Sequence, residues 1–196
     1  QKEFDYLPNG GFYYEKTQLN RKAVSTGTTA SAGFKTSGNY WEYLAFNRSN
    51  TNLGFMWFTN NNLYRTTNLS TAPPTWDSIF TFTTPVTAMH SCIADPTRLY
   101  VITNDAKIQV CSNALDPSPT FTTFTLPSPS GSLASIAAIA NDANKVYISI
   151  NNKVYYSSNG GATWIDITYN LPNVNHRKIL AEEFGGSQEL VFIATN

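Results

Sequence analysis

The stretch Val154-Tyr155-Tyr156-Ser157-Ser158-Asn159, followed shortly by Thr163-Trp164, decides the fold because a similar stretch occurs three times in the chain. Each copy joins a short strand-like run to turn-forming residues. A repeat with an offset of about 45 residues indicates an architecture built from stacked, equivalent units. The earlier copies are Leu63–Asn68 followed by Thr75-Trp76, and Ile108–Asn113 followed by Thr120-Phe121.

Each copy is preceded by two more strand-like runs, joined by turn-forming residues. The tight Asn-rich turns, such as Asn60-Asn61-Asn62 and Asn151-Asn152-Lys153, tolerate the positive φ that hairpins need. No stretch of a dozen residues has the apolar period of a helix. The second strands are expected at Phe55–Thr59, Leu99–Thr103, Val146–Ile150 and Leu190–Ala194, and the first at Tyr43–Phe46, Ser91–Ala94, Ala137–Ala140 and Lys178–Ala181.

Four antiparallel strands recurring at about 45 residues predict an all-β fold, a β-propeller of four-stranded blades. We expect an N-terminal segment, or a partial or closing blade, in 1–40, and one propeller domain in 41–196. That domain holds three full blades and the start of a fourth, so the propeller is expected to be incomplete in this chain. The apolar strand Leu190–Ile193 would then leave an unpaired edge, at which further blades or another chain are expected. The expected blades are 41–86, 87–128 and 133–170, with the fourth beginning near His176.

Composition excludes several classes of protein. The net charge is +0 and only 13% of residues are charged, which argues against a nucleic-acid binder. No apolar run approaches the roughly 18 residues of a membrane helix, so no membrane span is expected. The chain begins at Gln1 without Met and is rich in Asn, Ser and Thr, from which we expect an exported chain whose signal peptide has been removed.

The segment Ser157–Trp164 resembles the Asp-box, or BNR repeat, of pattern S-x-D-x-G-x-T-W, with Asn159 where the family usually has Asp. Sialidases, sortilin-type propellers, xyloglucanase-type glycoside hydrolases and many secreted bacterial surface proteins carry this box. The resemblance implies a propeller fold and little about chemistry, because the box hairpin lies opposite the ligand face in that family. The structural residues of the box are expected to be Ser158, Asn159, Gly160, Gly161, Thr163 and Trp164.

Candidate catalytic residues are sparse, and we expect none. None of the five arginines lies in a sialidase-like motif, so all are expected at the solvated surface. A glycosidase needs two carboxylates facing each other across a cleft. Asp95, Asp105 and Asp142 occupy turn positions, and the neighbours Glu182 and Glu183 would point to opposite faces of a strand.

His90 and His176 both precede expected inner strands, which would place them on the same rim. They are either loop histidines or two groups near a common ligand, and with no third ligand we expect no metal and no cofactor. Cys92 and Cys111 are expected on the first and third strands of one blade, about 9.6 Å apart. A disulfide needs Cα atoms within about 7 Å, so both should be free and buried.

A binding surface is the remaining source of function. Aromatic and Asn side chains suit sugar rings or peptide segments. The leading expectation is a non-enzymatic secreted or cell-surface propeller module that binds a carbohydrate or protein. The alternatives are a truncated glycoside hydrolase of xyloglucanase or sialidase type and a sortilin-like sorting or assembly factor. Trp41 and Tyr43 could instead belong to the core between two blades. The candidate binding residues are Tyr40, Trp41, Tyr43, His90, Tyr169, Asn173 and His176.

Overall fold

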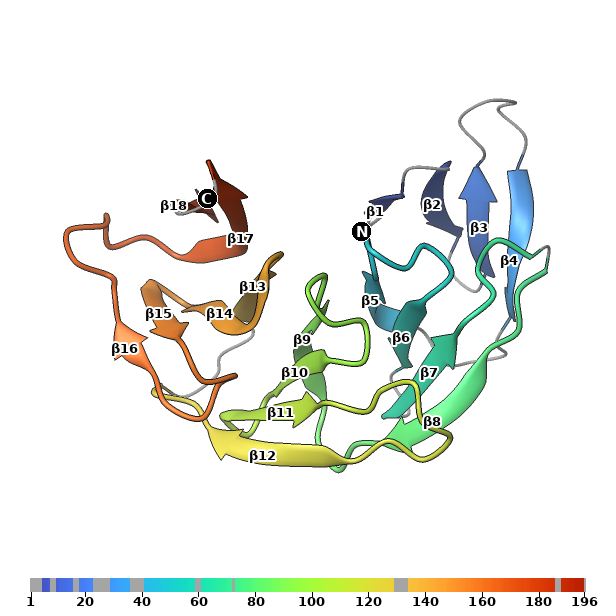
Figure 1. The fold of residues 1–196 in the computed structure, drawn as a ribbon, viewed down its shortest axis with the longest axis horizontal. Helices are drawn as coiled ribbons and strands as arrows, with labels where there is room; N and C mark the ends of the chain where they lie inside the picture. Colours follow the sequence, from blue (N-terminus) through green and yellow to red (C-terminus); the bar gives the residue numbers. More distant parts are fainter. Residues whose placement is uncertain are drawn as a thin grey trace. The chain divides into compact units, whose positions relative to one another are not determined.

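The computed structural model describes residues 5–7, 10–15, 18–22, 29–35, 41–58, 61–71, 73–128, 134–185 and 188–195. Among these residues the ordered elements are strands, with no helix, which confirms the all-β class (Figure 1). The chain divides into two compact units, Gln1–Phe82 and Thr83–Asn196. Each unit is built from antiparallel sheets whose strands follow one another in chain order.

The first unit contains two four-stranded sheets. In each, consecutive strands form hairpins, so neighbours in sequence are neighbours in the sheet. One sheet consists of β1 (Asp5–Leu7), β2 (Gly10–Glu15), β3 (Gln18–Lys22) and β4 (Thr29–Lys35), and the other of β5 (Trp41–Phe46), β6 (Gly54–Phe58), β7 (Asn62–Thr66) and β8 (Asp77–Thr81).

The second unit contains two four-stranded sheets and a two-stranded one. The first sheet consists of β9 (Val86–Ser91), β10 (Leu99–Thr103), β11 (Lys107–Cys111) and β12 (Phe121–Thr125). The second consists of β13 (Ala134–Ile139), β14 (Asp142–Ile150), β15 (Lys153–Ser157) and the short β16 (Ile165–Asp166). The terminal hairpin consists of β17 (His176–Phe184) and β18 (Gln188–Thr195). The four-stranded antiparallel sheets predicted from the repeat beyond residue 40 are therefore present.

The predicted positive φ in the tight turns is confirmed. Asn61, Ala106 and Asn151 have φ of 66°, 61° and 53°, and each begins or precedes the third strand of its sheet. Two of the three are Asn, the residue that most readily adopts this conformation after Gly. Their 45-residue spacing shows that the repeat extends to individual backbone angles.

The core of the second unit lies between its sheets. Apolar residues of β9–β12 and one face of β13–β16 form a buried cluster that includes Tyr100, Ile102, Ile108, Val146 and Ile148. The opposite face of β13–β16 packs against the terminal hairpin. That second cluster contains Ala137, Ile139, Tyr147, Val154, Ile179 and Ala181, with Tyr156, Ile167, Val191 and Ile193 partly buried against it.

The alignment of Leu190–Ala194 with Val146–Ile150 is wrong by one residue. Val146 and Ile148 face the preceding sheet, whereas in β18 Val191 and Ile193 do so. Because side chains alternate between faces, a slip of one residue reverses the whole strand. Phe192 is therefore 55% exposed on the outer face, and Leu180, its cross-strand partner, is 48% exposed.

Neither cysteine is in a disulfide and both are buried, as predicted. Cys92 follows directly after β9 and Cys111 ends β11. Burial raises the pKa of the Cys92 thiol, which keeps it protonated.

Candidate functional site

The best-defined polar feature is a turn that recurs in three sheets, between the third and fourth strands. An Asn side chain accepts a hydrogen bond from the backbone N–H of a Thr further along the turn. The Oδ1 atoms of Asn68, Asn113 and Asn159 accept from Thr75, Thr120 and Thr163, each at 2.9 Å. The same hydrogen bond between Asn and Thr therefore closes the two longer turns and the shorter third one.

A second contact to the same Asn also recurs. The residue two positions earlier donates to its Oδ1 atom: Thr66 at 3.0 Å, Cys111 at 3.2 Å and Ser157 at 2.9 Å. Cys111 thus occupies a hydroxyl position and uses its S–H as the donor. The sequence predicts only that this cysteine is buried and outside a disulfide, although its alignment with Thr66 and Ser157 was the available signal for the donor role.

The third turn is the tightest. Gly160 and Gly161 have φ of 69° and 92°, which favours glycine. The Ser157 hydroxyl accepts from the Gly161 N–H at 2.8 Å, and the Asn159 amide donates to the Thr163 hydroxyl at 2.8 Å. Ser158 is exposed, and Trp164 packs against the cluster shared with the preceding sheet. The Asn159 side chain therefore both accepts and donates hydrogen bonds within its own turn.

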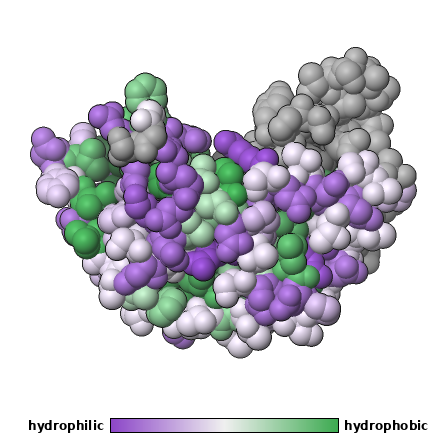
Figure 2. Space-filling view, in the orientation of Figure 1, coloured by the Kyte–Doolittle hydropathy of each residue, from purple (hydrophilic) through white to green (hydrophobic). Residues whose placement is uncertain are grey.

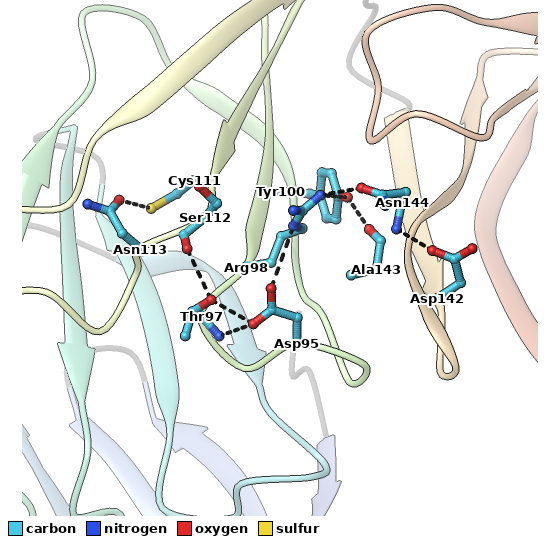
Figure 3. A network of polar contacts seen from close by, with 10 residues as sticks. All are labelled: Asp95, Thr97, Arg98, Tyr100, Cys111, Ser112, Asn113, Asp142, Ala143 and Asn144. Atoms are coloured by element: carbon cyan, nitrogen blue, oxygen red, sulfur yellow. Dashed lines mark hydrogen bonds and ion pairs between the residues drawn. The ribbon is translucent and has the colours of Figure 1, made fainter.

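A network around Arg98 joins two sheets of the second unit (Figure 3). The Arg98 Nη1 donates to Asn144 Oδ1 at 2.8 Å, and the Tyr100 hydroxyl donates to the carbonyl of Ala143. The Arg98 Nε lies 3.9 Å from an Asp95 carboxylate oxygen. A Cβ atom on Gly160 would come within 3.2 Å of Arg98 Nη1, so the Gly turn is packed against this network.

Two arginines differ from the expectation of solvated surface positions. Arg98 bridges two sheets, as described above. Arg65 on β7 is only 8% exposed. A guanidinium has several donors in a fixed plane, which lets it serve as a structural connector between elements.

The aspartates Asp95, Asp105 and Asp142 make local contacts at or beside turns, as the sequence predicted. Asp95 accepts from Thr97, and Asp142 accepts from the backbone N–H of Asn144 at 2.8 Å. Asp105 lies 2.7 Å from Lys107 Nζ. The Lys107 and Thr103 contacts lower the pKa of the Asp105 carboxyl against the opposing effect of burial. These three carboxylates are therefore engaged in hydrogen bonds or ion pairs that hold the local structure.

The aromatic group near residue 41 is only partly placed. Tyr40 lies outside the described residues, and Trp41 is the first residue of β5. Tyr43 is partly buried, with its ring centroid 6.1 Å from that of Trp57. This ring contact favours the core interpretation of Tyr43 over a binding role.

His90 and His176 do not share a rim. Tyr100, which pairs with His90 near the end of β9, bonds Ala143 near the start of β14, just after the end of β13. The start of β17 instead lies beside the start of β13, where the Ile179 N–H donates to Ser135 Oγ at 3.1 Å. The two histidines therefore lie at opposite ends of the first strands, and the structure does not bring them together.

His176 occupies a core position. The backbone N–H groups of Phe82, Leu126 and His176 donate to the carbonyls of Asn61, Ala106 and Asn151, the three residues with positive φ. All three donors are buried, and His176 is 2% exposed. Burial lowers the pKa of His176, while a hydrogen bond with the backbone of Lys153 opposes this. His176 thus replaces the Phe or Leu of the other repeats.

The connection between β16 and β17, residues 167–175, is the most exposed of the predicted binding segments. Tyr169 is 87% exposed and has φ of 44°. The Thr168 side chain anchors the start of the connection, accepting from the Val154 N–H at 3.0 Å, and the Asn152 amide donates to Asn173 Oδ1. Exposed Leu171 and Val174 lie on the same segment. Tyr169 and Asn173 therefore lie on one anchored connection. Figure 2 shows that hydrophilic and hydrophobic residues are mixed over the visible face of the described residues.

Within the described residues, no group of three His, Cys, Asp or Glu side chains could hold a metal ion. No helix of the described part is long and apolar enough to cross a membrane. Comparison with known protein families gives no matching family model, and comparison with curated proteins gives no match.

Proposed function

We propose that this chain supplies consecutive blades of an Asp-box β-propeller, exported from the cell, that binds carbohydrate without catalysing a reaction. The repeated four-stranded sheets and the three Asn-closed turns support the propeller assignment. The Asn159 turn supports the Asp-box assignment, because it uses the box residues for the contacts that their chemistry predicts.

The observation that carries the binding proposal is the exposed Tyr169 ring on the anchored connection 167–175. A flat aromatic ring stacks on the apolar face of a sugar. The neighbouring exposed side chains of Asn170, Asn173 and Asn175 carry amide donors and acceptors for hydroxyl groups. Carbohydrate fits this combination better than a protein, which would favour a broader apolar centre.

The engaged carboxylates support a non-enzymatic role. Glycoside hydrolysis needs two carboxyl groups free to exchange protons or attack the sugar. Asp166 accepts from the Thr168 N–H at 2.8 Å, and this contact, followed by Lys153, lowers the pKa of its carboxyl. Glu189 is bound by Lys145 and Tyr147. Such residues are held in the ionised state by structural partners.

The test is binding of the full chain to an array of defined oligosaccharides. A bound glycan should lose about tenfold in affinity on Tyr169→Ala, which corresponds to roughly 1.4 kcal/mol. The matched control is Leu115→Ala, which removes an exposed apolar side chain from another turn of the same unit and should leave binding unchanged. The proposal is contradicted if no glycan on the array binds, or if the two variants have equal effects on binding. If a protein binds instead, and its binding depends on Tyr169, the ligand is a protein and not a carbohydrate.

A further inference from the structure

The connection 167–175 is held mainly at its two ends. Seven successive residues, 169–175, are exposed, and they lie between the buried residues Thr168 and His176. Figure 1 shows this segment as a long loop that joins β16 to β17. A segment with so little buried surface has few contacts of its own to resist local opening. The shape in which it presents Tyr169 therefore depends on the residues that anchor it.

The start of the connection is anchored by β15. The Ile167 N–H donates to the Val154 carbonyl at 2.9 Å, and the Thr168 hydroxyl accepts from the Val154 N–H at 3.0 Å. None of these three residues has a side chain that ionises. We therefore expect this anchor to be unaffected by pH between about 5 and 8.

The end of the connection is anchored by the turn between β14 and β15. The His176 N–H donates to the Asn151 carbonyl at 2.6 Å. The Asn152 amide donates to Asn173 Oδ1. Both contacts join the last residues of the connection to the same short turn, so they form or break together.

An opening at His176 need not spread along β17. The pairing of β17 with β18 is irregular between His176 and Lys178, which separates His176 from the regular pairs that follow. Ile179 is fully buried, and its N–H donates to Ser135 Oγ at 3.1 Å. The strand is therefore held independently three residues beyond His176.

The buried position of His176 suits a neutral side chain. Phe82 and Leu126 occupy the equivalent positions of the other repeats. The imidazole has a hydrogen bond with the backbone of Lys153, whereas its Nδ1 atom is buried and has no hydrogen-bond partner among the described residues. A protonated ring carries an N–H on both nitrogens and a positive charge. The second donor would lack an acceptor here, so the charged ring is favoured only in water.

His176 is also the one histidine on the elements that surround it, and histidine is the side chain whose charge ordinarily changes near neutral pH. β13 has no ionisable residue. Hydrogen bonds with Thr168, followed by Lys153, lower the pKa of the Asp166 carboxyl; burial opposes a lowered pKa at Glu189, but Lys145 and Tyr147 outweigh it. The ionisable groups of β15, β16, β17 and β18 are Lys153, Tyr155, Tyr156, Asp166, Arg177, Lys178, Glu182, Glu183 and Glu189.

We propose that protonation of His176 opens the end of the connection 167–175 and removes the support that holds Tyr169 in place. The imidazole leaves its buried position for water, and the contacts of Asn173 and His176 with the turn are lost. The anchor at Thr168 remains. The connection is then closed near neutral pH and open in mildly acidic solution. The opening depends on the anchors alone, whereas its effect on ligand binding rests on the carbohydrate proposal.

The test is amide hydrogen exchange of residues 169–178 in the full chain without ligand, measured by mass spectrometry for the wild type and His176→Leu. The two proteins are compared at the same pH, which cancels the direct effect of pH on exchange. Burial lowers the pKa of His176 from 6.5, so the open form binds the proton more strongly and closure is lost as the pH falls through and below that value. At about pH 5 the gain in the open form is at most about thirtyfold, and we expect the wild type to exchange about tenfold or more faster than the variant. At about pH 7.5 the two should agree within about twofold.

A second variant and a second segment serve as controls. His176→Phe, with the residue found at position 82, should behave as His176→Leu and excludes a poor fit of leucine. Residues 121–126 should exchange equally in all three proteins, because Leu126 makes the equivalent backbone hydrogen bond without a histidine. Equal exchange of residues 169–178 in the wild type and both variants at about pH 5 overturns the proposal. Equal acceleration of residues 121–126 in the wild type also overturns it, since the opening is then not local. Because no ligand is present, the oligosaccharide array tests the carbohydrate proposal separately.

Discussion

The two faces of the sheet β13–β16 are covered to different extents. On one face a complete sheet, β9–β12, buries Val146, Ile148 and Ile150 together with Tyr100 and Ile102. On the other face the two-stranded hairpin leaves Tyr156 and Ile167 partly exposed. The same sheet therefore has a finished interface and an unfinished one. Burial of the third and fourth strands depends on a full sheet opposite, since a hairpin covers only the first two.

The largest expected effect comes from truncating matched Ile residues on the two faces. Ile148→Ala should cost about 3 to 4 kcal/mol, because its side chain is fully buried in the finished interface. Ile193→Ala, in the unfinished interface, should cost about 1 to 2 kcal/mol. Urea unfolding followed by tryptophan fluorescence measures both values. Equal losses would mean that the two faces are equally packed.

Two glycines with similar backbone angles sharpen the same comparison. Gly160 has φ of 69° and is packed against Arg98, whereas Gly185 has φ of 65° with nothing within 4 Å of a built Cβ. Gly185→Ala should cost about 1 kcal/mol, the strain of a left-handed alanine. Gly160→Ala should cost roughly 2 to 3 kcal/mol, because the Arg98 network must also shift. If the melting temperatures of Gly160→Ala and Gly185→Ala agree within error, the Arg98 network adapts to the added methyl group without cost.

Ala106 tests whether the finished side carries local strain. Asn61 and Asn151 occupy the equivalent positive-φ positions, and Ala106 has φ of 61°. Ala106→Asn should therefore stabilise the protein by about 0.5 kcal/mol. Ala162→Asn, at an exposed turn position without positive φ, is the control and should give no gain in the urea midpoint.

The smallest effect at neutral pH is expected at His176, on the unfinished side. Burial holds the pKa of His176 below its ordinary value of 6.5, so the unfolded chain binds the proton more strongly. Stability should be unaffected well above pH 6.5 and should fall as the pH drops through and below that value. His176→Leu, the residue at the equivalent position 126, should remove this slope. Asp105 and Asp166 have lowered pKa values, so their losses begin at more acidic pH. The measurement is the unfolding midpoint of the wild-type chain and of His176→Leu at several pH values. If stability changes with pH in the same way in both proteins, the assignment to His176 is refuted.

Much of the fold could be predicted from the sequence, because the signals are local. The three copies around Asn68, Asn113 and Asn159 carry the turn chemistry within a few residues of each other. The repeated strand-like runs indicated where most strands lie, and the Asn-rich turns indicated where φ is positive. The exposed Tyr169 connection also followed from its place between two strand patterns.

The role of His176 could not be predicted in this way. The equivalent residues Phe82 and Leu126 directly follow fourth strands, whereas β16 is short and a long connection precedes His176. The sequence period therefore points to the wrong residue. The alignment of Leu190–Ala194 with Val146–Ile150 was wrong by one residue for a related reason, since an apolar strand of five residues contains no signal that distinguishes its two faces.

The sequence by itself determined the strand order, the repeat, the turn types and the absence of a disulfide between the cysteines, because each depends on contacts within one unit of about 45 residues. Only the tertiary structure decided which residues connect the sheets: Arg98 with Asn144, Glu189 with Lys145, and His176 in an apolar position. These contacts join residues that lie more than forty positions apart or that no local pattern relates. They depend on how one sheet is rotated against the next, which is set by the packing of whole faces and not by any single segment.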